Sequence, residues 1–381
     1  MQYRTFGKLE WQPSALGFGA MRLPVIDGDR ANIDVAEATR MLRYAIDHGV
    51  NYVDTAYPYH ARHSETLVGR ALQDGYRQRV KLATKLTHRM LKEFEDLDAY
   101  LEAQLARLQT DHIDFYLLHG LDEKGWQECR AIDALKWAEQ AMADGRIGHL
   151  GFSFHDRFEV FQDIVDAYDG WTFCQIQYNY MDEEHQAGTR GLKYAAEKGL
   201  AIVVMEPLRG GQLAGTPPPE VQALWDQAPR QRTPAEWALQ WVWDHPEVSL
   251  LLSGMSTMEQ VQQNIASACD SGPGTLSDEE KALIAQVRDT TRKLCPIPCT
   301  GCEYCLPCPN DVNIPRILQL YNEAFMYNDV ELARANYGWV KAEQRADQCI
   351  ACGECEEKCP QGISIIEWLE KADRLLSAKE E

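Results

Sequence analysis

The sequence predicts a (β/α)8 barrel followed by a small, mostly α-helical domain, and two observations support this fold class. Up to about residue 290, eight short apolar runs alternate with longer amphipathic stretches. Eight strand–helix units over roughly 250 residues are typical of a parallel barrel surrounded by helices. Beyond that point the composition changes, because nine of the twelve cysteines lie between Cys295 and Cys359. We therefore expect a barrel over residues 1–290 and a second domain over residues 291–381.

The expected strands are rich in Val, Ile, Leu and aromatic residues and almost continuously apolar, as strands covered on both faces should be. They occupy residues 15–20, 50–56, 80–86, 113–119, 147–154, 173–179, 200–206 and 248–255. A doubly wound sheet is the alternative, but no strand is followed by the G-x-G-x-x-G pattern of its usual ligand site. Residues 3–11, before the first strand, are expected to form a small hairpin that closes the barrel floor.

Helical periodicity fills the intervals between the strands, for example at residues 34–49, 96–111 and 233–246. In the last of these, Thr233 is the expected N-cap and Pro234 the first helical residue. In the cysteine-rich region, residues 314–340 and 363–377 have the same periodicity. The second domain is therefore expected to consist of helices with cysteine runs as loops.

The charge and the apolar runs exclude several classes of protein. The formal net charge of −20 disfavours a nucleic-acid partner, which normally meets a basic surface. The N-terminus has no apolar run behind a basic start, and no stretch of about eighteen apolar residues occurs. We expect a cytoplasmic protein without a membrane or nucleic-acid partner.

Polar residues stand at the ends of three successive expected strands. Asp54, Lys85 and His119 each fall where an apolar run stops. Each alone has a structural explanation, as a helix cap, an ion-pair partner or a buried histidine. In barrels of this class, however, active sites form at the carboxyl ends of the strands. Three such residues on one rim therefore indicate a catalytic site.

The motifs "VDTAYPY", "ATK" and "DFYLLH", in this order, resemble those of the aldo-keto reductases. The similarity continues through "GFSFH", "CQIQYN" and "SGMSTMEQVQQN" and covers essentially residues 1–290. The resemblance implies a barrel that transfers hydride between a nicotinamide cofactor and a carbonyl. The catalytic set that it implies is Asp54, Tyr59, Lys85 and His119.

The chemistry explains why this set contains these residue types. A tyrosine, with a pKa near about 10, is a reluctant proton donor and a poor base at neutral pH. A neighbouring Lys85 ammonium is expected to lower that pKa and make Tyr59 the general acid/base. Asp54 would keep Lys85 charged, and His119 would orient the carbonyl oxygen. The family spacing selects Tyr59 rather than Tyr57.

The same resemblance implies residues for the cofactor. Ser153 and Gln175 would hold the nicotinamide carboxamide, Asn264 would contact the adenine, and Arg209 in "PLRGGQL" would reach the pyrophosphate. For Gln175 the alternative is a buried amide that satisfies the strand-end backbone.

Three departures from the family pattern concern the cofactor. Phe154 follows Ser153 where the family often has Asn, and Met205 stands where an aromatic residue commonly stacks on the nicotinamide. No Lys or Arg occurs in residues 251–280, where family members that prefer NADPH hold its 2′-phosphate. We therefore expect NADH rather than NADPH. The first two departures leave a different redox partner open.

Two cysteine runs follow the barrel. The second has the spacing C-x2-C-x2-C-x3-C-P of bacterial ferredoxins, and the first is one residue tighter before its last cysteine. In two-cluster ferredoxins the fourth cysteine of each run ligates the other cluster. On that rule, one [4Fe–4S] cluster is held by Cys299, Cys302, Cys305 and Cys359. The other is held by Cys349, Cys352, Cys355 and Cys308.

Structural zinc is the alternative for these cysteines. Zinc sites use two separated pairs of ligands, whereas three cysteines on one tight loop suit the corner of a cubane cluster. We expect iron–sulfur, with two clusters rather than one. Cys295 is expected to be a spare thiol.

The whole chain resembles the aldo-keto reductases that carry a C-terminal ferredoxin-type domain. We expect a carbonyl reductase with [4Fe–4S] clusters, which either transfer electrons or are structural. The alternative is an electron-transfer protein that exchanges electrons with a ferredoxin-like partner, and a flavin converter has no sequence motif here to support it. A Schiff-base aldolase that uses Lys85 and a binding subunit on an inactive barrel are further alternatives.

Overall fold

The computed structural model describes residues 1–377 and contains a closed barrel of eight parallel strands in chain order. Each strand pairs with the next, and β1 pairs with β8. The strands are β1 Leu16–Gly19, β2 Tyr52–Asp54, β3 Lys81–Leu86, β4 Ile113–Leu121, β5 Ile147–Phe154, β6 Phe173–Gln177, β7 Ala201–Met205 and β8 Val248–Gly254. The predicted fold class is confirmed.

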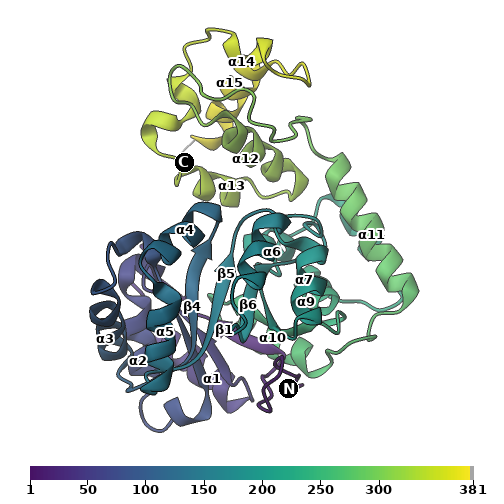
Figure 1. The fold of residues 1–381 in the computed structure, drawn as a ribbon. Coiled ribbons are helices and arrows are strands. Elements are labelled where there is room, and N and C mark those ends of the chain that lie inside the picture. Colours follow the sequence, from purple (N-terminus) through teal and green to yellow (C-terminus); the bar gives the residue numbers. More distant parts are fainter. Residues whose placement is uncertain (378–381) are drawn as a thin grey trace. The chain divides into compact units, whose positions relative to one another are not determined.

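Helices follow the strands along the chain (Figure 1). They are α1 Val35–Asp47, α2 Ser64–Ala71, α3 Asp96–Leu108, α4 Glu123–Ala131, α5 Ala134–Ala143, α6 Phe158–Asp166, α7 Gly188–Glu197, α8 Pro219–Trp225, α9 Pro234–Trp243 and α10 Met258–Cys269. The Thr233 hydroxyl accepts a hydrogen bond from the Glu236 amide at 3.1 Å, which confirms Thr233 as the cap of α9.

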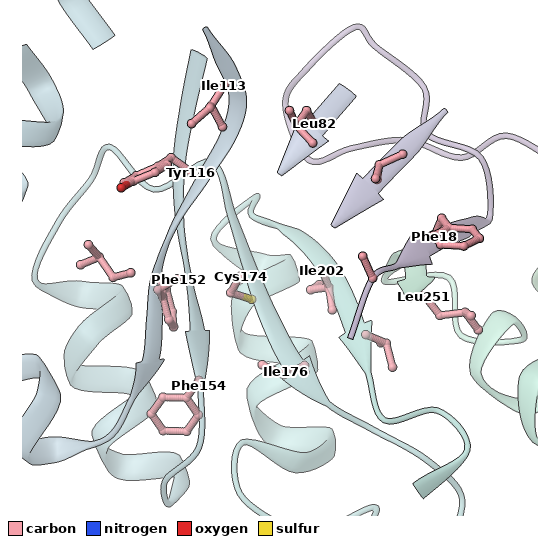
Figure 2. Close-up of a cluster of buried hydrophobic side chains, with 14 of the residues drawn as sticks. Phe18, Leu82, Ile113, Tyr116, Phe152, Phe154, Cys174, Ile176, Ile202 and Leu251 are labelled. Atoms are coloured by element: carbon pink, nitrogen blue, oxygen red, sulfur yellow. The ribbon is translucent and has the colours of Figure 1, made fainter. Parts of the chain in front are cut away.

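Successive side chains of the strands alternate between the helical layer and the barrel interior. Outward-facing residues such as Tyr116, Phe152 and Cys174 belong to the large hydrophobic cluster between strands and helices (Figure 2). Inward-facing residues such as Tyr52 and Phe173 form a separate cluster inside the barrel. Because the period of a strand is two, the next inward-facing residue after Tyr52 is Asp54, and the next after Phe173 is Gln175. Both belong to the predicted site.

The segment before β1 fills the floor of the barrel, as predicted. Phe6 pairs with Leu9 in an antiparallel bridge and is fully buried in the interior cluster. Its ring centroid lies 4.8 Å from that of Phe115 and 5.7 Å from that of Phe173. The N-terminal segment therefore supplies the lowest layer of the barrel core.

Phe6→Ala is expected to lower the free energy of unfolding by about 3–5 kcal/mol, since a large buried ring is lost and a cavity remains. Val35→Ala is a matched control, because Val35 is exposed on α1 and surface substitutions usually stay within about 0.5 kcal/mol. Urea denaturation of both variants measures the difference. A cost for Phe6→Ala close to that of the control would contradict the role of this ring in closing the floor.

The chain forms two compact units. The first comprises Met1–Leu208 and Ala238–Ser277, and the second comprises Arg209–Trp237 and the chain from Asp278 onward. The second unit thus includes the loop after β7 and helix α8. The predicted domain boundary near residue 290 falls inside α11 Asp278–Lys293, so the division into residues 1–290 and 291–381 stays a prediction.

The second unit has its own hydrophobic core. Its further helices are α12 Ile314–Met326, α13 Val330–Tyr337, α14 Glu354–Glu357 and α15 Ile365–Leu376 (Figure 1). Buried residues of α12 and α15, such as Leu318 and Leu369, pack together in this core. Within residues 1–377, no helix combines the length and the apolarity needed to cross a bilayer.

Candidate active site and cysteine loops

A cavity of about 200 Å³ opens at the carboxyl ends of the barrel strands. Six of the predicted site residues line it: Asp54, Tyr59, Lys85, His119, Ser153 and Gln175. A larger cavity of about 670 Å³ lies beside the starts of β3 and β4. In this cavity, Asp114 forms ion pairs with Arg77 at 2.9 Å and with Lys81 at 2.8 Å. These charged side chains therefore pair with one another within the fold. The smaller cavity is the candidate active site.

Lys85 is the centre of this site. Its ammonium is 1% exposed and donates to Asp54 Oδ1 at 2.6 Å, to the Thr55 carbonyl at 2.8 Å and to the Tyr59 hydroxyl at 3.3 Å. Three acceptors match the three protons of a charged ammonium. Burial disfavours that charge, but Asp54 and Tyr59 outweigh it and raise the pKa of Lys85. Burial also raises the pKa of Asp54, against the opposing ammonium. The short contact and the filled donor set favour the ion pair.

A carboxylate network holds the strand that carries Lys85. Glu65 on α2 is fully buried and accepts hydrogen bonds from Thr84, Gln104 and Arg107, each at 2.7 Å. Gln104 also donates to the Lys85 carbonyl at 3.1 Å. A buried carboxylate with every partner satisfied fixes its neighbours in place. This network therefore fixes the backbone of β3 at Lys85.

Tyr59 opens a short 3-10 segment after β2 in which His60 and Ala61 have φ of 49°. His60 is buried and accepts a hydrogen bond from the Leu23 amide at 3.0 Å. Residues without glycine's freedom rarely adopt this left-handed conformation, and such strain gathers at functional sites. The turn therefore costs conformational energy to place the Tyr59 hydroxyl beside Lys85.

The titration properties of Tyr59 and His119 suit a proton donor and a neutral hydrogen-bonding group. Burial raises the pKa of Tyr59, although Lys85 acts in the lowering direction that the sequence predicts. Burial, reinforced by Lys85, holds the pKa of His119 well below its usual value. The two rings meet edge to face with centroids 6.1 Å apart. At neutral pH the site therefore presents a phenol and a neutral imidazole.

Ser153 and Gln175 are register partners on β5 and β6. The Ser153 hydroxyl accepts a hydrogen bond from the Gly120 amide at 2.7 Å. The Gln175 carboxamide contacts Met205 Sδ through its nitrogen at 3.7 Å. Its oxygen is buried and has no hydrogen-bond partner among residues 1–377. An unsatisfied buried acceptor beside a cavity points to a ligand that donates to it.

The other two predicted cofactor residues lie outside the lining of this cavity. Asn264 on α10 is buried and donates to the Ser253 hydroxyl at 3.1 Å. Arg209 belongs to the second unit, where its guanidinium bonds to Gln212 and pairs with Glu323 at 3.2 Å. Both assignments stay predictions.

Sequence reasoning missed three charged or titratable residues of the lining: Arg22, His155 and Glu206. His155 and Glu206 directly follow β5 and β7, so their position at strand ends was a usable signal. Burial lowers the pKa of His155. Glu206 has a φ of 55°, and its carbonyl accepts from the buried Asn179 amide at 3.1 Å. Arg22 follows β1 by three residues, but its contact with Gly254 comes from the other end of the barrel sequence.

The two cysteine runs have the same backbone conformation around their middle cysteines. Gly301 and Glu303, on either side of Cys302, have φ of 67° and 62°. Ala351 and Gly353, which flank Cys352, have φ of 55° and 84°. Left-handed residues on both sides of a cysteine curl the chain around it, at a cost for Glu303 and Ala351. Two loops that repeat this feature point to two similar ligand sites.

The second unit brings the two runs together. Cysteines of both runs pack against one hydrophobic core, and the Asn310 amide donates to the Gln348 carbonyl at 2.5 Å. Burial raises the pKa of Cys305, and the thiols that add to this effect are Cys299, Cys302 and Cys359. Cys359 of the second run therefore lies close enough to the first run to affect the pKa of Cys305. Ligation of the first cluster by Cys359 would need this proximity.

Cys355 is grouped with its own run. Burial raises its pKa to about 11, with contributions from Glu356, Cys349 and Cys352. Within residues 1–377, no three His, Cys, Asp or Glu side chains converge as ligands of a single metal ion.

The barrel and its site define an oxidoreductase of the (β/α)8 class, and comparison with known proteins gives the family. A model of the aldo/keto reductase family matches residues 15–289, and a model of a 4Fe-4S dicluster domain matches residues 298–364. The chain belongs to the aldo/keto reductase family and carries a C-terminal 4Fe-4S domain. The predicted family and its subgroup are confirmed.

Relatives and solved structures resemble the barrel. The uncharacterized oxidoreductase YqkF of Bacillus subtilis is 27% identical and is covered over 99% of its length by 77% of this chain. The L-galactose dehydrogenase of Arabidopsis thaliana is 26% identical, and the match covers 76% of this chain and 97% of the dehydrogenase. The holo form of aldo-keto reductase AKR11C1 from Bacillus halodurans has a TM-score of 0.63 at 26% identity, covering 75% of this chain and 96% of its own. An aldo-keto reductase from Klebsiella pneumoniae in complex with NADPH has a TM-score of 0.60 at 27% identity, and the match covers 76% of this chain and 96% of the reductase.

Proposed function

We propose that this protein reduces a carbonyl substrate, or oxidises the corresponding alcohol, by hydride transfer with a nicotinamide cofactor. The observation that supports this most directly is the Lys85 ammonium, which contacts the Asp54 carboxylate and the Tyr59 hydroxyl in one cavity. When bound, the reduced nicotinamide supplies hydride to the carbonyl carbon. The chain's residues have to supply a proton to the oxygen and to hold the substrate in place.

Tyr59 is the general acid of the reduction. Its raised pKa keeps the phenol protonated at neutral pH, so it donates its proton to the developing alkoxide. The phenolate that remains is stabilised by Lys85, which Asp54 keeps charged. His119, with its lowered pKa, is neutral and donates a hydrogen bond to the carbonyl oxygen. In the oxidation, Tyr59 takes the proton back.

The site also fits the nicotinamide. The unpartnered Gln175 oxygen is an acceptor for the amide group of a nicotinamide carboxamide, and Ser153 is its register partner on the neighbouring strand β5. NADH is the expected cofactor, because residues 251–280 contain no Lys or Arg for a 2′-phosphate. The related Klebsiella pneumoniae structure holds NADPH, so both cofactors belong in any test.

The cysteine loops are proposed to hold two [4Fe–4S] clusters in the crossed arrangement. Cys299, Cys302, Cys305 and Cys359 would ligate one, and Cys349, Cys352, Cys355 and Cys308 the other. The repeated left-handed residues and the grouping of Cys359 with Cys305 support this arrangement. Such clusters exchange single electrons when bound. Reduced thiols are needed to build them, which is consistent with the expected cytoplasmic location.

An electron-transfer role is the second candidate, and one observation favours it. Cys302 and Cys352 are exposed, and the apolar residues beside them, Tyr304 and Ile350, are 65% and 63% exposed. Clusters at these loops would lie near the surface, within reach of a ferredoxin-like partner. A Schiff-base aldolase is disfavoured, because that chemistry needs a neutral amine and the pKa of Lys85 is raised.

The experiment is an anaerobic titration of purified protein with NADH and then NADPH, with and without a panel of aldehydes. The panel should include hydroxylated aldehydes, since an L-galactose dehydrogenase is among the relatives. We expect the absorbance of the reduced nicotinamide to fall only when a carbonyl is present, while the cluster absorbance stays. Bleaching of the clusters by NADH alone would favour the electron-transfer role and require a converter such as flavin. Cofactor binding without turnover of any carbonyl would favour a binding subunit.

A further inference from the structure

Arg22 lies in the loop after β1 and lines the active-site cavity. No residue within 1–377 forms a hydrogen bond or an ion pair with its guanidinium. Other arginines of the same unit are paired, for example Arg77 with Asp114 and Arg107 with Glu65. In a chain with 58 acidic and 38 basic residues, a half-buried arginine without a carboxylate partner needs an explanation. A cation that faces a cavity points to an anionic ligand.

The surroundings hold Arg22 in place and keep the approach to it open. Its carbonyl accepts a hydrogen bond from the Ser256 hydroxyl at 2.9 Å. Its side-chain stem lies against Gly254, where an added Cβ would approach Arg22 Cβ and Cγ to 3.1 Å. Gly254 pairs with Gly19 across β8 and β1, and both line the cavity. The lack of a side chain at Gly254 therefore makes room for the stem of Arg22 at the edge of the cavity.

The position of Arg22 suits the middle of a dinucleotide. A cavity of about 200 Å³ is too small for a whole dinucleotide, so only its nicotinamide end fits beside Gln175. The predicted adenine contact, Asn264, bonds to Ser253 on β8. The connection between the two ends therefore passes the carboxyl end of β8, where Arg22 lies against Gly254. That connection is a diphosphate, and the planar guanidinium fork matches phosphate oxygens.

We infer that Arg22 binds the diphosphate of the nicotinamide cofactor. This inference rests on the proposed function and adds a binding residue to it. Arg209, the cation that the family resemblance suggests, is already paired with Glu323 and lies over the Tyr327 ring at 5.2 Å. Because NADH and NADPH share the diphosphate, Arg22 serves both and does not select between them.

The test measures the binding of ADP-ribose, which carries the diphosphate without the nicotinamide, and of NADH by calorimetry. It uses the full chain, purified anaerobically, and Arg22→Gln. We expect both ligands to bind about tenfold more weakly or worse, since a charge-assisted hydrogen bond is about twice as strong as a neutral one. The affinity of the wild type should also fall more steeply with salt than that of the variant. Arg40→Gln is the matched control, because Arg40 is exposed on α1 and pairs with Glu37.

Arg22→Lys keeps the charge but loses the planar fork, so its affinity should lie between those of the wild type and Arg22→Gln. Circular dichroism shows whether each variant is folded, and the Lys variant decides the matter if the Gln variant is not. Equal affinities of wild type and folded Arg22 variants for ADP-ribose would overturn the inference. If the wild type itself binds neither ADP-ribose nor NADH, the proposed function fails instead.

Discussion

Replacing Tyr59 by Phe is expected to lower kcat by about 10²- to 10⁴-fold, the usual contribution of a general acid/base. The substitution removes only the hydroxyl that receives a hydrogen bond from Lys85 at 3.3 Å. The ring remains to fill its place against His119, so the cofactor should still bind. Steady-state rates with NADH and a carbonyl from the panel, together with the NADH dissociation constant, measure the two effects separately.

Tyr57→Phe is the matched control for this prediction. Tyr57 is the other tyrosine of the motif, and its ring contacts Arg62 at 5.2 Å, Arg107 at 4.6 Å and Tyr100 at 5.8 Å. These are contacts of the ring, which Phe keeps, so turnover should change little. Full activity in Tyr59→Phe, or an equal loss in both variants, would mean that the proton comes from another group.

The raised pKa of Tyr59 also sets the pH dependence of the two reaction directions. Reduction uses the protonated phenol, so its rate should be level near neutral pH and decline as the pH approaches the raised pKa. Oxidation uses the phenolate, so its rate should increase with pH over the same range. Tyr59→Phe should remove this dependence from whatever activity is left.

Cysteine substitutions should show the largest effect on the iron–sulfur unit. With two clusters, the protein should contain about eight iron atoms per chain. Cys305→Ser and Cys359→Ser should each lower this to about four, because the crossed rule assigns both residues to one cluster. Combining these two substitutions should still leave about four. Iron analysis and electron paramagnetic resonance of the reduced protein count the clusters that remain.

The contrasting pair is Cys305→Ser with Cys355→Ser, which should remove both clusters, since Cys355 is grouped with Cys349 and Cys352. Cys295→Ser is the matched control, because its thiol bonds to the Ile297 carbonyl at 3.2 Å and is expected to be spare. Complete loss of iron in the Cys305 and Cys359 double variant would show that each run ligates its own cluster.

Much of the fold could be read from the sequence because its signals are local. Each strand is a short apolar run, and Thr233 with Pro234 marks the start of α9 by neighbouring residues alone. The grouping of Asp54, Lys85 and His119 in one candidate site could likewise be predicted, since strand ends of a parallel barrel meet on one rim. Because every second side chain of a strand faces the barrel interior, Asp54 and Lys85 are expected directly above the apolar interior core.

What the sequence did not disclose depends on contacts between distant segments. Arg22 lies against Gly254, more than half the chain away, so a search for basic residues near the last strand could not find it. The net direction of the Tyr59 pKa shift depends on burial as well as on Lys85. No local signal shows that the loop after β7 belongs to the second unit, because this depends on its contacts with the chain from Asp278 onward.

That loop has a consequence for the order in which the protein can be made. Residues 209–237 leave the ribosome well before residues 278–377, yet they share one compact unit. Arg209 must wait for Glu323, and Arg232 for Glu280 at 2.5 Å. Helix α8, with the buried Trp225, likewise packs against α11 of the later segment. Residues 209–237 therefore cannot complete their packing until residues 278–377 have been made, and until then they are open to chaperones and proteases.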